Sequence, residues 1–91
     1  MDGNQAEIVE ALRGIPDCSV LVLSAVGQGC PDLMVGYRGF NFLFECKDPS
    51  QPKHRHELTD DQHAFHAAWN GQVQKVFSLK EIITAMTGWN P

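Results

Sequence analysis

Apolar and polar positions recur along this chain with two periods, one typical of helices and one typical of strands. Apolar residues three or four positions apart, such as Ile8 and Leu12, indicate a helix with one buried face. Runs rich in Val and Leu, and strict alternation over short stretches, indicate strands. The patterns predict helices at 4–13, 59–69 and 78–86, and strands at 18–24, 32–37, 40–47 and 73–77. The order α-β-β-β-α-β-α favours a single α/β domain in which helices flank a mixed sheet.

Residues that cap helices stand at the start of each predicted helix. Thr59 with Gln62, and Ser78 with Glu81, have the spacing of a capping box, in which two residues bond each other's backbone. Asn4 is the candidate N-cap of the first helix. These signals support the three helices independently of the apolar pattern.

Arg38 and Gly39 lie at the predicted turn of a hairpin. Gly at the second loop position suits a type I′ turn, which needs a positive φ angle there. A two-residue loop pairs Tyr37 with Phe40, Val35 with Phe42, Leu33 with Phe44 and Asp32 with Glu45. Because side chains alternate between faces, one face becomes apolar and is expected in the core. That face holds Leu33, Val35, Tyr37, Phe40, Phe42, Phe44 and Cys46.

The opposite face of the hairpin carries Asp32, Glu45 and Lys47, together with two apolar residues. Like charges on neighbouring strands are destabilising unless a positive charge lies between them. Lys47 meets that need as a salt bridge, and so does a divalent cation such as Mg²⁺, which prefers carboxylate oxygens and water. Both interpretations stay open on pairing geometry. A three-residue loop would instead pair Asp32 with Phe44 and weaken the argument.

Composition narrows the class of protein. The 91 residues are 43% hydrophobic and 20% charged, as in one ordinary globular domain. A net charge of −4 is unfavourable for tight, non-specific DNA binding. The longest apolar run, at 20–26, is too short for a membrane helix, and no signal peptide is visible. Three cysteines at unrelated spacings indicate reduced thiols, so we expect a cytoplasmic protein.

The local sequence around the carboxylates resembles a known nuclease motif. Pro31-Asp32 is followed, after twelve residues, by Glu45-Cys46-Lys47. The chain resembles the PD-(D/E)XK nuclease superfamily, and more closely the stand-alone virus-type replication-repair nuclease (VRR-NUC) domains of phages and bacteria. The resembling segments are 29–36, 44–48 and 58–62, and with 4–13 and 69–71 they cover nearly the whole chain.

The resemblance implies a restriction-endonuclease-like fold over residues 1–91 and a Mg²⁺- or Mn²⁺-dependent deoxyribonuclease. It implies a homodimer that cuts branched DNA, such as four-way junctions, in the cytoplasm of a bacterium or a phage-infected host. Lys47 would orient or deprotonate the attacking water, and Gln62 would be the polar residue of the following helix. The implied metal ligands are the carboxylates of Glu7, Asp32 and Glu45 and the main-chain carbonyl of Cys46.

Several of these residues have a structural alternative. Glu7 also has the position to complete a capping box with Asn4, and Glu10 is a weaker candidate for the additional carboxylate. Gln62 is fully explained as a helix-capping residue. The basic segment Lys53-His54-Arg55 is either a solvated loop or a phosphate contact.

Two further interpretations concern the whole protein. One is a non-catalytic DNA-binding or regulatory module with a nuclease-like fold, which the acidic balance favours slightly and the intact Asp-Glu-Lys set opposes. The other is a metal-binding protein that uses the histidines at 54, 56, 63 and 66, although structural zinc sites usually include cysteine. In the same region, Phe65 and Trp69 are four positions apart on one helix and are expected in the core.

Overall fold

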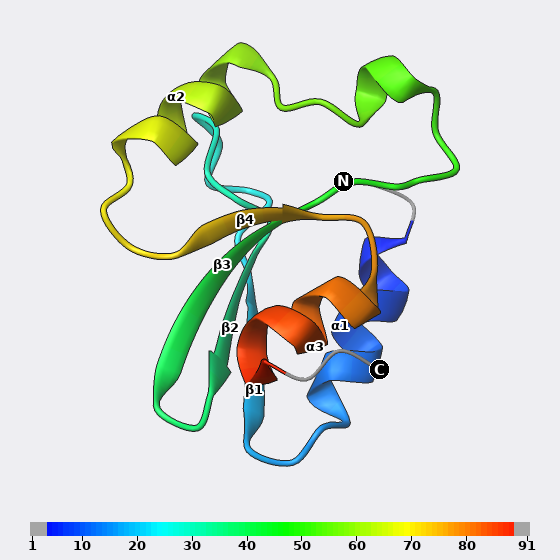
Figure 1. The fold of residues 1–91 in the computed structure, drawn as a ribbon, viewed down its shortest axis with the longest axis vertical. Coiled ribbons are helices and arrows are strands. Elements are labelled where there is room, and N and C mark those ends of the chain that lie inside the picture. Colours follow the sequence, from blue (N-terminus) through cyan, green and yellow to red (C-terminus); the bar gives the residue numbers. More distant parts are fainter. Residues whose placement is uncertain (1–3, 89–91) are drawn as a thin grey trace.

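The computed structural model of the chain describes residues 4–88 and consists of three α-helices, four strands and one short 3₁₀ turn (Figure 1). The elements are α1 (Gln5–Arg13), β1 (Cys18–Val22), β2 (Leu33–Tyr37), β3 (Phe40–Cys46), η1 (Lys53–Arg55), α2 (Asp60–Ala68), β4 (Val73–Val76) and α3 (Leu79–Thr87). The predicted α/β class and the order α-β-β-β-α-β-α are confirmed. No helix within residues 4–88 has the length and apolar character of a membrane span.

The strands form one mixed sheet in the order β1-β2-β3-β4. β1, β2 and β3 are antiparallel neighbours, while β4 runs parallel to β3. The hairpin has the predicted register, with Leu33 opposite Phe44. Positive φ angles at Arg38 (49°) and Gly39 (89°) allow the type I′ turn that this register requires. The parallel pairing places the C-terminal ends of β3 and β4 at the same end of the sheet.

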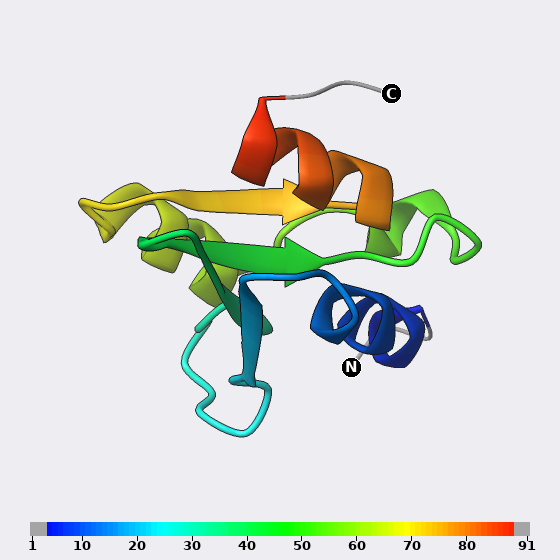
Figure 2. The same ribbon diagram turned by 90° about the horizontal axis from the view of Figure 1, so that it is seen from below.

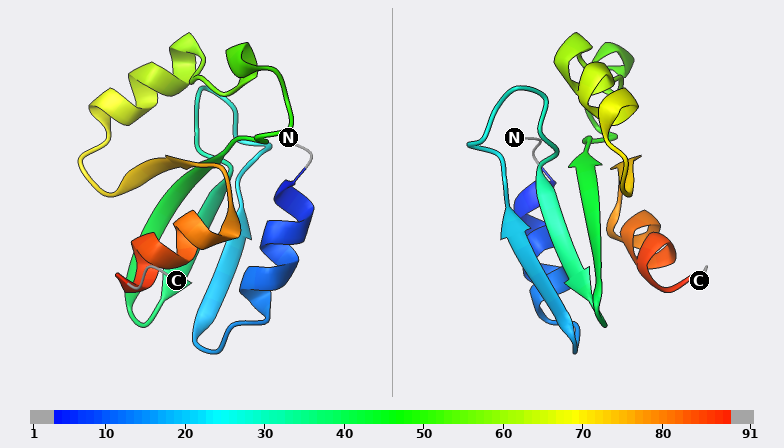
Figure 3. Two further views of the ribbon diagram at one scale, coloured as in Figure 1. Left: turned by 45° about the vertical axis from the view of Figure 1, so that its right-hand side comes forward. Right: turned by 90° about the vertical axis from the view of Figure 1, so that its left-hand side faces the viewer.

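One face of the sheet forms the hydrophobic core with α1 and α3. Leu12 of α1 and Ile82 of α3 are both fully buried against it. α1 lies next to β1, and α3 lies next to β4 (Figure 2). Figure 3 shows α2 and η1 away from these two helices, at the end of the sheet toward which β3 points. The buried residues that the hairpin contributes to the core are Leu33, Val35, Phe42, Phe44 and Cys46.

Two aromatic residues that were expected in the core are exposed. Phe40 is 65% exposed because it adjoins the hairpin turn, outside the cluster that the helices cover. Trp69 is 46% exposed and stacks on Phe65, with ring centroids 5.2 Å apart. The core interpretation is wrong for these two residues, since the end of α2 lies outside the main core.

The predicted helix caps are confirmed for α2, confirmed in part for α3 and wrong for α1. Thr59 and Gln62 form the complete capping box at the start of α2. Ser78 accepts a hydrogen bond from the backbone N–H of Glu81 at the start of α3, but the carboxylate of Glu81 accepts from the backbone N–H of Phe77, so the predicted capping box is only half formed. Asn4 precedes α1 but makes no side-chain cap, because its backbone is already helical (φ −92°, ψ −4°) and not extended; its Nδ2 instead donates to main-chain carbonyls elsewhere in the molecule.

Candidate active site

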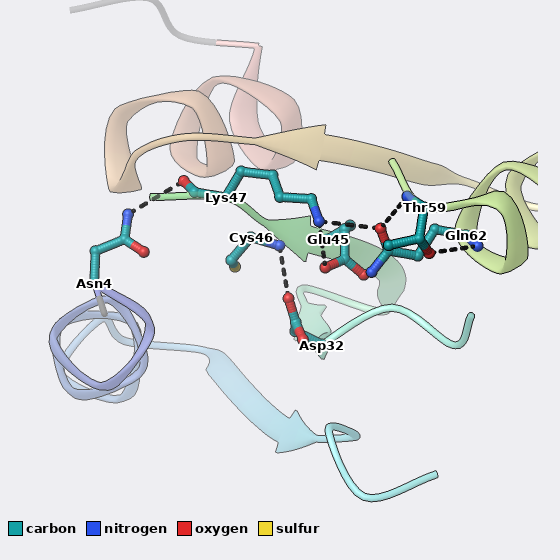
Figure 4. Close-up of polar contacts among 7 residues, drawn as sticks. All are labelled: Asn4, Asp32, Glu45, Cys46, Lys47, Thr59 and Gln62. Atoms are coloured by element: carbon teal, nitrogen blue, oxygen red, sulfur yellow. Dashed lines mark hydrogen bonds and ion pairs between the residues drawn. The ribbon is translucent and has the colours of Figure 1, made fainter. Parts of the chain in front are cut away.

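Asp32 lies at the entrance to β2, one residue before the last paired position of the hairpin. Its Oδ2 accepts a hydrogen bond from the backbone N–H of Cys46 at 2.9 Å (Figure 4). The carboxylate of Asp32 is therefore attached to the C-terminal end of β3. The predicted hairpin brings it there, although the ladder itself ends at Leu33 and Phe44.

Glu45 of β3 and Lys47, which directly follows β3, point away from the core and are nevertheless buried. They are 3% and 7% exposed, and Nζ of Lys47 lies 3.8 Å from Oε2 of Glu45. Charged side chains are rarely buried to this extent unless they are paired. The salt bridge that the sequence left open thus forms between Lys47 and Glu45, and Asp32 bonds the backbone instead.

Gln62 connects α2 to this pair. Its Oε1 accepts a hydrogen bond from Nζ of Lys47 at 3.0 Å and another from the backbone N–H of Thr59 at 2.9 Å (Figure 4). The backbone N–H of Gln62 donates in return to Oγ1 of Thr59. One oxygen therefore caps the helix and positions the lysine amine, so the two roles proposed for Gln62 are compatible.

The glycine-containing loop before Asp32 is packed against the start of α2. Gly29 has a φ angle of +78°, and a Cβ atom built on it would lie 2.2 Å from the backbone oxygen of Asp61. Only glycine fits such a close approach of two backbones. This contact fixes the loop that carries Asp32 relative to the helix that carries Gln62.

Cys30, which the sequence analysis did not single out, is a neighbour of the carboxylates of Asp32 and Glu45. Burial raises the pKa of its thiol, and the negative charges of Glu45 and Asp32 raise it further. The two carboxylates therefore act on the same small region. Cys46, by contrast, directs its side chain into the core with 1% exposure, which leaves only its main chain at the site.

The N-terminus of α1 also reaches this end of the sheet. Nδ2 of Asn4 donates to the carbonyls of Phe77 (3.1 Å) and Lys47 (3.5 Å). Gln5 is completely buried and donates to Oγ of Ser24 at 3.2 Å. Sequence reasoning missed both contacts, because an amide near a helix start has no signal that names its partner.

Glu7 is exposed on α1, one turn after Asn4. Its carboxylate makes no hydrogen bond or ion pair with any residue between 4 and 88. Glu10, the weaker candidate, is also exposed. The structure thus brings Asp32, Glu45, Lys47 and Gln62 together and leaves Glu7 on the surface nearby.

No hydrogen bond or ion pair among residues 4–88 joins the basic segment to this cluster. Lys53, His54 and Arg55 form η1 and are all exposed. The guanidinium of Arg55 contacts the side chain of Gln51 at 3.5 Å. Within the described chain, no three His, Cys, Asp or Glu side chains are grouped as ligands for a metal ion.

Comparison of the chain with protein-family models, with curated proteins and with solved structures found no match. Two carboxylates and a lysine amine at one end of a sheet have the donors for a hydrated divalent cation and for a phosphate group.

Proposed function

We propose that this protein is a Mg²⁺- or Mn²⁺-dependent deoxyribonuclease that hydrolyses phosphodiester bonds, with a restriction-endonuclease-like fold of the VRR-NUC type. The observation that carries the proposal is the convergence of Asp32, Glu45 and Lys47 at one end of the sheet. Their order in the chain is that of the resembled motif. The strand order and the parallel β3–β4 pair are compatible with the proposed fold.

The donor set fits a magnesium ion. Mg²⁺ commonly uses only one or two carboxylates and completes its shell with water and substrate phosphate. Asp32 and Glu45 supply the two carboxylates, and the main-chain carbonyl of Cys46 is the proposed third donor. The absence of a larger ligand cluster in residues 4–88 is compatible with this kind of site. A bound metal ion would supply charge stabilisation for the phosphate and lower the pKa of water.

The remaining residues act on water and phosphate. The amine of Lys47, held by Glu45 and Gln62, is positioned to orient the attacking water and to stabilise charge on the scissile phosphate. Gln62 fixes the direction of that amine. Glu7 is the proposed additional carboxylate, because residues three apart on a helix share a face and Asn4 already contacts this end of the sheet.

The proposed substrate is branched DNA, such as a four-way junction, and the proposed form is a homodimer in a bacterial or phage-infected cytoplasm. A two-fold dimer presents two active sites to two strands. Lys53, His54 and Arg55 are proposed phosphate contacts, since they form an exposed basic group on η1. The net charge of −4 favours recognition by local contacts over a general attraction to DNA.

A cleavage assay tests the proposal. Labelled single-stranded, duplex, flap and four-way-junction DNA is incubated with the protein in Mg²⁺, Mn²⁺ or EDTA. We expect metal-dependent cleavage that Asp32→Asn and Lys47→Met each reduce by on the order of 100-fold or more. Asp17→Asn is the matched control, because Asp17 is an exposed acid paired with Arg38 near the hairpin turn.

Circular dichroism and thermal melting of each variant separate lost activity from lost fold. Cleavage that persists unchanged in Asp32→Asn would contradict the site. Metal-independent DNA binding without cleavage of any substrate would instead favour the non-catalytic DNA-binding module.

A further inference from the structure

Lys75 is a second lysine beside the proposed catalytic residues, and it comes from β4. The parallel register places it directly next to Glu45. Paired residues of neighbouring strands project from the same face, with their strands about 4.8 Å apart. Lys75 therefore shares the face of Glu45 and Lys47, although it is 30 residues away from Glu45 in the chain.

The amine of Lys75 has no carboxylate partner within residues 4–88. It lies 5.4 Å from the ring centroid of Phe77, which directs it along the strand toward the end of the sheet. That end is where Asn4 bonds the carbonyls of both Phe77 and Lys47. The side chain is partly buried, whereas lysines usually extend into water.

The pKa of His66 depends on the charges in this region. It lies one turn after Gln62 on α2, on the same helix face. Burial lowers the pKa of His66, and the positive charges of His63, Lys47 and Lys75 lower it further. Lys47, which directly follows β3, and Lys75 of β4 thus both act on His66 through their positive charges.

Lysine charges that converge in a partly buried region repel each other, and an anion would offset that repulsion. Glu45 pairs with Lys47 at 3.8 Å, while the amine of Lys75 lies over the ring of Phe77, the residue after β4. A DNA strand whose scissile phosphate lies at Asp32 and Glu45 carries its next phosphate one nucleotide away.

We propose that Lys75 binds a phosphate adjacent to the scissile phosphate on the same strand. This inference rests on the proposed function, since it names a further substrate contact of that site. Lysine acts there as a point charge, so the contact adds affinity without reading base sequence.

The test measures binding of a labelled DNA duplex by fluorescence anisotropy over a series of KCl concentrations, in EDTA so that no strand is cut. For Lys75→Gln we expect affinity to fall about tenfold, or about 1.4 kcal/mol. We also expect the slope of log K against log[KCl] to become shallower by about one. Lys75→Arg should keep most of the slope, because it retains the charge.

Lys80→Gln is the matched control, since Lys80 is exposed on α3 and α3 packs on the core side of the sheet. An unchanged slope in Lys75→Gln, or an equal change in Lys80→Gln, would overturn the inference. If Lys75→Gln fails to fold, acylation of Lys75 in the wild-type protein, followed by mass spectrometry, decides the question. DNA should protect its amine, and equal labelling with and without DNA would contradict the contact.

The binding slope is measured without cleavage, so its outcome is distinct from that of the nuclease assay. Metal-dependent cleavage by the wild-type protein together with an unchanged slope in Lys75→Gln would contradict only the Lys75 contact. A changed slope in Lys75→Gln without any metal-dependent cleavage would contradict the proposed hydrolysis and support a DNA-binding surface at Lys75.

Discussion

Glu45 and Lys47 are two ions that the fold removes from water. Transfer of each ion from water costs several kcal/mol, which their attraction offsets only in part. With exposures of 3% and 7%, both are stabilised by their ion pair, and Lys47 also by its hydrogen bond to Gln62. Preformed charges in a region with little water act strongly on a bound anion, and that is the physical basis of the proposed site.

His66 makes the stability of the protein dependent on pH. Its folded-state pKa lies below the ordinary value of 6.5, so the unfolded chain binds more protons in the range between the two values. The contribution of neutral His66 to the free energy of unfolding is therefore fully present above about pH 6.5. It is lost as the pH falls through the folded-state pKa. Denaturant unfolding at pH 8 and pH 5 should show a smaller loss for His66→Gln than for wild type. Parallel losses in the two proteins would contradict this role.

At the scale of elements, the site depends on how α2 and the loop at 24–31 meet. The loop carries Asp32 at its end, and α2 carries Gln62 in its first turn. The close approach of Gly29 to Asp61 is the point at which the two segments touch. The site therefore needs both segments, because the loop positions Asp32 and α2 positions Gln62.

Gln62 and Thr59 share a capping box, so two variants separate capping from lysine positioning. Thr59→Ala and Gln62→Ala each remove capping hydrogen bonds, which should lower the free energy of unfolding by about 1 kcal/mol, and Gln62→Ala should lower it further because Lys47 is buried. Only Gln62→Ala also removes the acceptor of the Lys47 amine. We expect its cleavage rate to be at least about tenfold lower than that of Thr59→Ala. Equal rates at equal stability would show that Gln62 acts only as a cap.

Gly29 and Gly27 allow a matched comparison of Gly→Ala substitutions in the loop before Asp32. Both have φ angles of +78°, but a Cβ atom on Gly27 would meet nothing within 4 Å. Gly27→Ala should cost about 1 kcal/mol from backbone strain alone. Gly29→Ala adds a backbone clash and should cost at least about 2 kcal/mol more, with loss of cleavage. Similar melting temperatures for the two variants would contradict the contact with α2.

At the scale of the whole molecule, β1 is an edge strand of the sheet within the described chain. Edge strands present unpaired backbone groups that another chain can bond. Leu21 (57%), Val22 (40%) and Val26 (63%) add exposed apolar surface on β1 and just after it. We expect this edge to form the interface of the proposed homodimer.

Light scattering coupled to gel filtration tests the dimer. We expect a mass of twice the 10.1 kDa chain, and a monomer for Leu21→Glu. Phe40→Glu is the matched control, since Phe40 is 65% exposed at the hairpin turn, away from the end of β1. A monomeric wild type at all concentrations, or a dimer that only Phe40→Glu disrupts, would rule out this interface.

The sequence by itself determined the element order, the hairpin register and the face that carries Asp32, Glu45 and Lys47. These features follow from local physics. Apolar periodicity distinguishes helix from strand, and the turn at Arg38-Gly39 sets the pairing of the residues on both sides. Once the turn is known, alternation decides which side chains share a face.

Only the tertiary structure decided which distant groups meet at that face. The parallel pairing of β4 with β3 placed Lys75 beside Glu45, and the packing of α2 brought Gln62 to Lys47. Asn4 bonds distant carbonyls in place of its own helix. Such partners are chosen by long-range packing, in which one amide or amine has many possible acceptors along the chain. Local periodicity carries no information about that choice.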